Sequence, residues 1–135
     1  GTALTAFSTL VSDDLREAVG HGFDADLAAQ LGKAMATFGA ATATLGGKMQ
    51  SDGPRKTMAQ ATLYLDAFGL IVMGWMHAKC VVAARNSPNV SAEYAEGKTL
   101  AAAYFFRHEL SRLDEICGRL SELDETFVPA QAANF

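Results

Sequence analysis

The chain has 135 residues, of which 50% are apolar and 19% are charged. This length fits one domain and this composition can build a buried core, which excludes a chain that is disordered throughout. The formal net charge of −4 comes without the basic patch that phosphate binding requires, so we expect no nucleic-acid partner.

Composition also favours helices over sheets. The chain has 25 Ala but only seven Val and two Ile, which is typical of closely packed helices and not of a β-sandwich or barrel.

The first predicted helix covers residues 3–19, where apolar residues recur at spacings of three and four. Residues 20–22, Gly-His-Gly, predict its end, because Gly tolerates the left-handed conformation of a helix stop. Asp24 then predicts the N-cap of a second helix.

The second predicted helix extends to about Met49. One of its faces carries an apolar stripe: Leu27, Leu31, Met35, Phe38, Leu45 and Met49. Thr42 is the polar step in that stripe, and its hydroxyl can bond back to a carbonyl one turn earlier. Small residues line the adjacent face: Gly32, Ala36, Gly39, Ala43 and Gly46. This second stripe predicts the close approach of another helix.

The third predicted helix covers residues 54–86, with Pro54 at its first position. It is apolar on nearly all sides between Ala61 and Ala84, which is typical of a central helix or of one covered by a partner. The uncharged run at residues 67–76 is shorter than the roughly 20 residues that cross a bilayer. We therefore expect a buried helix and no membrane span.

The fourth predicted helix covers residues 92–126, with Ser91 as its cap. Its apolar stripe contains Leu110, Leu113, Cys117, Leu120 and Phe127. The four segments predict an all-α fold, an antiparallel up-and-down helical bundle of about four helices that forms a single domain over residues 1–135. Cys80 and Cys117 are expected to be buried free thiols, which fits a cytoplasmic protein.

No pattern in the chain predicts a metal site or a catalytic residue. The Glu-x-x-His motif of metal-binding bundles is absent, and His21, His77 and His108 lie on three different segments. Two pairs place a nucleophile three residues after a base, namely His77 with Cys80 and His108 with Ser111. Neither pair has a third group to orient the base, so we interpret them as ordinary neighbours on a helix.

Asp66 is the most conspicuous polar residue, because it lies within the most apolar helix. A buried carboxylate needs a partner, and the candidate cations are Lys79, Arg107 and Arg112. Structural pairing is the favoured interpretation and a ligand contact is the alternative, in which Asp66 and His77 would be polar anchors of a small-molecule pocket. The aromatic side chains of Tyr64 and Trp75 are expected in the core or at an interface, each with its polar atom on a partner.

Two short motifs resemble a known domain. Residues 61–75 contain Tyr64-Leu65, Gly69 and Gly74-Trp75, and residues 98–110 contain Lys98, the pair Phe105-Phe106 and then His108. The chain resembles, best over residues 54–113, the appended C-terminal helical domain of large bacterial acyl-CoA dehydrogenases. These enzymes include the long-form fatty acyl-CoA and methylmercaptopropionyl-CoA dehydrogenases. We expect structural roles for the motif residues, with the two glycines permitting close helix crossing and Trp75 filling a seam.

The resemblance implies a division of labour within a flavoenzyme of fatty acid metabolism. Enzymes of this kind oxidise an acyl-CoA to its 2,3-enoyl form, with FAD accepting the hydride and a Glu removing the α-proton, and both groups belong to preceding domains. The resemblance thus implies no catalytic, cofactor-binding or metal residue in this chain, and FAD only in the parent enzyme.

The expected partners are the rest of the parent dehydrogenase and a second subunit, in a homo-oligomer such as a dimer. The chain would then be a domain removed from a longer flavoenzyme. Two alternatives stay open: an independent helical protein that binds a partner, and a bundle with a small-molecule pocket.

Overall fold

The computed structural model describes residues 1–126 and 128–135. The α-helices in chain order are α1 (Thr2–Gly20), α2 (Ala25–Asp52), α3 (Pro54–Met58), α4 (Ala61–Arg85), α5 (Ala92–His108) and α6 (Leu113–Glu122). Short 3-10 turns lie at Leu110–Arg112, between α5 and α6, and at Ala132–Asn134, after α6. No strand occurs in the described residues, so the predicted all-α class is confirmed. Phe127, the last position of the predicted stripe, lies outside the described residues.

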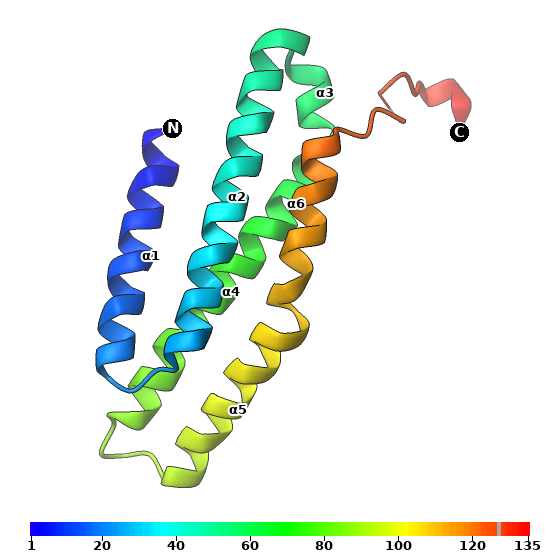
Figure 1. The fold of residues 1–135 in the computed structure, drawn as a ribbon. Coiled ribbons are helices and arrows are strands. Elements are labelled where there is room, and N and C mark those ends of the chain that lie inside the picture. The colour runs from blue at the N-terminus through cyan, green and yellow to red at the C-terminus, as the bar shows by residue number, and fades with distance from the viewer. Residues whose placement is uncertain (127) are drawn as a thin grey trace.

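Helices α2 and α4 pack against each other, and the remaining helices lie on either side of this pair. Helix α1 contacts both α2 and α4, whereas α5 contacts mainly α4, and α6 contacts both α2 and α4. The chain changes direction between α1 and α2, between α2 and α4, and between α4 and α5 (Figure 1). Helix α4 is therefore flanked by α1, α2, α5 and α6.

The predicted helix boundaries are confirmed where a capping side chain or a glycine with a positive φ sets the end of the helix. Asp24 Oδ1 accepts hydrogen bonds from the backbone N–H groups of Asp26 and Leu27 at 2.8 and 3.2 Å. Ser91 Oγ accepts the backbone N–H of Tyr94 at 3.1 Å and so caps α5. Gly22, in the predicted stop after α1, has a φ of +95° that favours glycine.

The two longest predicted helices are each interrupted, so the predictions of unbroken helices over residues 54–86 and 92–126 are wrong. Between α3 and α4, Gln60 is only 4% exposed, and its Nε2 donates to the carbonyl of Asp124 at 2.7 Å. Between α5 and α6 the chain passes through the 3-10 turn at residues 110–112. Helix α6 ends at Glu122, because Leu123 adopts a left-handed conformation with a φ of 53°.

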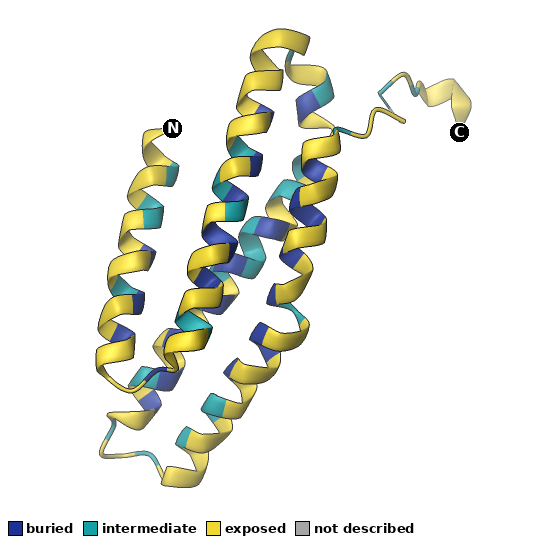
Figure 2. Cartoon of the chain, viewed as in Figure 1, coloured by how far each residue is buried: buried dark blue, intermediate teal, exposed yellow. Residues whose placement is uncertain are grey.

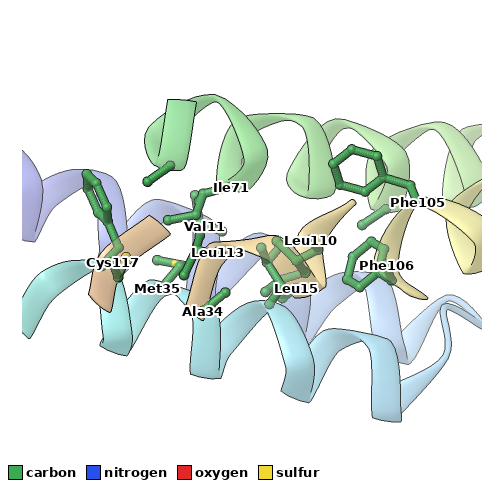
Figure 3. Close-up of a cluster of buried hydrophobic side chains, with 14 of the residues drawn as sticks. Val11, Leu15, Ala34, Met35, Ile71, Phe105, Phe106, Leu110, Leu113 and Cys117 are labelled. Carbon is green, nitrogen blue, oxygen red and sulfur yellow. The ribbon is translucent and has the colours of Figure 1, made fainter. Parts of the chain in front are cut away.

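The core lies where the helices face one another, and buried positions follow the inner side of each helix (Figure 2). Its largest fully buried side chains are Phe38, Phe106, Leu31, Ile71, Leu113, Leu120, Val11 and Val81. Figure 3 shows part of this core, with Ile71 and Leu113 in its middle and Phe105 and Phe106 further along the same interface. The predicted bond of Thr42 is confirmed, since its hydroxyl donates to the Phe38 carbonyl at 2.8 Å.

The stripe of small residues on α2 is not used within the described part of the chain. A Cβ atom built on Gly32, Gly39 or Gly46 would have no neighbour within 4 Å. Ala36 and Ala43 are exposed as well. The close helix approach that the stripe predicts is therefore not made by any described helix, and the face stays open.

Candidate functional site

Helix α4 has two apolar faces, of which only one is buried. The inner face packs in the core through Ala67, Ile71, Gly74, Ala78 and Val81. The opposite side, here called the outer α4 face, consists of Leu65, Gly69, Met73, Met76 and Cys80. Leu65 is 64% exposed, Met73 51% and Met76 37%. Spacings of three and four residues align these side chains along one surface of the helix, and the face contains no charge.

The two motif glycines of α4 have different surroundings. A Cβ at Gly74 would lie 3.2 Å from Leu31 Cδ1 and 3.6 Å from Phe106 Cζ. At Gly69 nothing lies within 4 Å. The absence of a side chain at Gly74 thus permits close packing inside the chain, whereas Gly69 leaves a flat strip in the middle of the outer α4 face.

The rotation of α4 about its axis is held by polar contacts to α1. The Trp75 indole Nε1 donates to Asp14 Oδ2 at 2.9 Å, and Lys79 Nζ donates to the same oxygen at 2.9 Å. Lys79 Nζ also lies 5.1 Å from the centre of the Trp75 ring. The hydrogen bond from Lys79, then that from Trp75, lowers the pKa of the Asp14 carboxyl. A polar partner is expected for the Trp75 indole, and the structure identifies it as Asp14.

Tyr64 lines a groove between the end of α2 and the α3–α4 corner. Its ring packs 4.8 Å from Phe38, centre to centre, and its hydroxyl shares a hydrogen bond of 3.3 Å with Thr42 Oγ1. The groove has a volume of about 400 Å³ and contains no charged lining residue. Its lining residues are Thr42, Leu45, Gly46, Met49, Thr57, Met58, Gln60, Ala61, Tyr64 and Leu65.

The predicted pairing of Asp66 is wrong. Asp66 is exposed, because it lies beside the outer α4 face and not on the inner side of the helix. Lys79 pairs with Asp14, and Arg112 pairs with Glu109 at 2.9 Å. No ion pair of Asp66 is found among residues 1–126 and 128–135, so desolvation does not require a partner for it.

In the part of the chain that the structure describes, Asp66 and His77 have different surroundings, since Asp66 is exposed and His77 packs against α5. The His77 ring packs against the Phe105 ring with their centres 4.8 Å apart. Its burial, followed by the charge of Lys98, lowers the pKa of His77. Neither Asp66 nor His77 lines the groove at the α3–α4 corner.

The second motif contributes mostly to the core. Phe105 and Phe106 are buried at 8% and 1% exposure. His108 is exposed, with its ring 4.5 Å from that of Tyr104. Lys98 Nζ lies 5.0 Å from the centre of the Tyr94 ring. Phe105 and Phe106 therefore pack between helices, whereas the contacts of His108 and Lys98 lie within α5.

The two thiols have different environments. Cys117 is buried as predicted, and its burial, with the charge of Asp114 second, raises the pKa of the thiol. Cys80 is exposed on the outer α4 face, so its predicted burial is wrong. Met76 and Met73, one and two turns before Cys80, are exposed on the same side of the helix, whereas its sequence neighbours Ala78 and Val81 are buried.

The described residues contain no group of three or more His, Cys, Asp or Glu side chains placed to hold a metal ion. Among the described helices, α4 is long and apolar enough to cross a membrane, judged by length and composition alone. The core helix of a soluble protein can have the same length and composition, and the inner face of α4 is buried against its neighbours.

The comparisons with known proteins identify the family. The family model described as acetyl-CoA dehydrogenase C-terminal like matches residues 7–131. The chain belongs to this family. No curated protein and no solved structure matches the chain.

Proposed function

We propose that this member of the acetyl-CoA dehydrogenase C-terminal like family is a non-catalytic domain of an FAD-dependent acyl-CoA dehydrogenase. Its role is to pack the outer α4 face against the rest of the enzyme or a second subunit. The observation that carries the proposal is this face, on which Leu65, Met73 and Met76 are exposed around Gly69. The family match over residues 7–131 supplies the class of enzyme.

The composition of the outer α4 face suits contact with another protein. An aligned apolar surface on a soluble domain is a typical interaction site. Burying a Leu or Met side chain contributes roughly 1.5–3 kcal/mol when the whole side chain leaves water. Methionine side chains adapt to irregular surfaces, and the strip at Gly69 would let a second helix approach closely.

The proposed division of labour places the chemistry outside this chain. FAD would accept the hydride in the preceding domains, and a Glu there would remove the α-proton. The side chains described here would cover apolar surface and hold the neighbouring domain in place. The changes of direction between successive long helices (Figure 1) support an antiparallel up-and-down bundle for this role.

A turnover assay tests the non-catalytic role. The 135-residue chain is mixed with FAD, an acyl-CoA and an artificial electron acceptor. We expect no acceptor reduction, and no flavin bound in stoichiometric amount after gel filtration. Turnover by this chain, or one flavin retained per chain, contradicts the proposal.

A matched pair of variants in the complete enzyme tests the docking face. Met73→Lys places a charge on the outer α4 face, where Met73 is 51% exposed, whereas Leu10→Lys places one on α1, where Leu10 is 50% exposed. We expect Met73→Lys to weaken the attachment of the domain, seen as faster limited proteolysis of the junction, and Leu10→Lys to behave like the wild type. Equal proteolysis of both variants and the wild type contradicts docking through this face.

The gene sequence upstream of the codon for Thr2 distinguishes the proposed dehydrogenase domain from the alternative, an independent helical protein that binds a partner. Several hundred codons in frame, encoding the flavin-binding domains, support a domain of a dehydrogenase. A start codon directly before Thr2 supports an independent helical protein that binds a partner through the same outer α4 face.

A further inference from the structure

We propose that the groove between the end of α2 and the α3–α4 corner is a binding site for a small uncharged molecule. This molecule has a hydrocarbon chain and one hydrogen-bonding group, such as an alcohol, carbonyl or amide. Neither Asp66 nor His77 lines the site, and Leu65 is the one lining residue that it shares with the outer α4 face. The proposal does not require that face to dock. It depends on three observations: the size of the groove, its lining and an unpaired hydroxyl.

The size and lining of the groove suit an apolar ligand. Its volume of about 400 Å³ falls in the range of about 300–1,000 Å³ that is typical of small-molecule sites. An apolar cavity of about 150 Å³ already binds benzene, so this groove can hold a longer molecule. Met49 and Met58 stand at its rim at 43% and 61% exposure, and their flexible thioethers can close over a chain.

The unpaired hydroxyl belongs to Thr57, which lines this groove. Thr57 is 8% exposed, and its Oγ1 has no hydrogen-bond partner among the described residues. Buried polar atoms are almost always paired, because an unmet hydrogen bond costs about 1–3 kcal/mol. The other polar side chains nearby are engaged, since Tyr64 bonds Thr42 and Gln60 bonds the Asp124 carbonyl. Thr57 Oγ1 is therefore the polar atom beside the groove that is left without a partner. Because less than 1 Å² of this atom is exposed, pairing with a ligand requires Thr57 to rotate about χ1 and turn its hydroxyl toward the groove.

The lining also predicts the charge of the ligand. No Lys, Arg, His, Asp or Glu borders the groove. A carboxylate placed there would lose its hydration without gaining a counter-ion, which is unfavourable. A hydroxyl or carbonyl can instead pair with Thr57, because a threonine hydroxyl both donates and accepts.

Methionine methyl NMR with 1-octanol as the probe tests the proposal directly. The chain has five methionines, of which Met49 and Met58 line the groove and Met73 and Met76 lie on the outer α4 face. We expect titration with 1-octanol to shift the methyl signals of Met49 and Met58 in a saturable manner and to leave Met73 and Met76 nearly unchanged. Octanoate at pH 7 should bind more weakly than 1-octanol.

Two results of this titration overturn the proposal. The first is the absence of any shift at Met49 and Met58 up to the solubility limit of 1-octanol, which would leave the groove to an apolar side chain of another protein. The second is an equal, non-saturating shift of all exposed methionines, which would indicate general adhesion to apolar surface.

Glycine variants of α2 supply a matched control. Gly46 lines the groove and its Cβ would have open space, whereas Gly47 is exposed and does not line it. We expect Gly46→Phe to abolish the octanol shifts and Gly47→Phe to retain them, with both chains folded because neither Cβ meets a neighbour. Retained binding in Gly46→Phe contradicts the location of the site.

Thr57→Val tests the hydrogen bond with two readouts that move in opposite directions. Removing the unpaired hydroxyl should raise the melting temperature of the ligand-free chain, because valine has the same shape and no unmet hydrogen bond. The same change should weaken 1-octanol binding about three- to tenfold, the effect of losing one neutral hydrogen bond. A raised melting temperature with unchanged affinity would assign Thr57 a purely structural effect and overturn the proposed anchor.

Discussion

The inner and outer faces of helix α4 are equally apolar in sequence but have opposite environments. Ile71 and Ala67 on the inner face are 0% exposed, whereas Leu65 and Met73 on the outer face are 64% and 51% exposed. Both sets lie on the same 25-residue helix. The contrast shows that the apolar composition of α4 does not tell which of its faces is buried. The packing of α4 against the neighbouring helices of the chain determines that only the inner face is buried.

The largest difference in the free energy of unfolding is expected when one side chain on each face is shortened to alanine. Ile71→Ala removes a fully buried side chain, and we expect it to lower the free energy of unfolding by about 2–5 kcal/mol. Met73→Ala on the outer face should change it by less than about 1 kcal/mol, since the side chain is already half in water. Urea denaturation of the isolated chain measures both. Equal losses would show that the outer face is covered, for instance by self-association.

The two glycines of α4 sharpen the comparison. Gly74→Leu forces a side chain against Leu31, so we expect a loss of about 1–3 kcal/mol. Gly69→Leu meets open space and replaces a poor helix former, so we expect a gain of up to about 1 kcal/mol. Thermal unfolding of the two variants tests the opposite signs. A loss at Gly69 comparable to that at Gly74 would contradict the open strip.

The contact of Asp14 with Trp75 and Lys79 should contribute stability that depends on pH. Because folding lowers the pKa of Asp14, the unfolded chain binds the proton more readily. This contribution is present above the ordinary carboxyl value of 3.8 and is lost as the pH falls through the lower folded value. Asp14→Asn should therefore lower the melting temperature at pH 7 and flatten its fall in acid.

Asp13→Asn is the matched control for Asp14. Among the described residues, Asp13 pairs with Arg16 on its own helix, and its side chain is 59% exposed. We expect the melting temperature of Asp13→Asn to follow the wild type across the acid range. The same response in both variants would show that the α1–α4 contact does not hold the rotation of α4.

The smallest effect is expected from His77, at the edge between α4 and α5. Its pKa is lowered by burial, so the unfolded chain takes up the proton first as the pH falls below 6.5. The contribution of a neutral His77 is complete above that value and decreases below it. Melting curves at pH 7.5 and 5.5 should show a smaller decrease in His77→Gln than in the wild type, and an equal decrease would contradict it.

Local chemistry made much of the fold predictable. Asp24, Ser91, Pro54 and Gly22 mark helix ends through their own side chains or backbone, and the structure places helix ends at each of them. The interruption at Gln60 depends on Asp124, which is 64 residues away. No local sequence pattern predicts that contact, because it forms only when two distant parts of the chain pack together.

The exposure of individual residues on α4 was the least predictable property. Apolar neighbours surround Asp66 and Cys80 in sequence, and this favoured burial for both. Their exposure follows from the rotation of α4, which Asp14 on α1 helps to hold. Thr57 and Met58 were likewise not identified, because the groove exists only where α3 and α4 meet at a corner.

Thiol labelling of Cys80 is the most direct test of the proposed interface. Cys80 lies on the outer α4 face and is exposed, whereas Cys117 is buried with a raised pKa. In the isolated chain, a disulfide reagent should therefore label Cys80 quickly and Cys117 slowly. In the complete dehydrogenase we predict at least tenfold slower labelling of Cys80, with Cys117 slow in both. Labelling of Cys80 at the same rate in the complete enzyme and in the isolated chain would contradict a role of the outer α4 face as the docking surface.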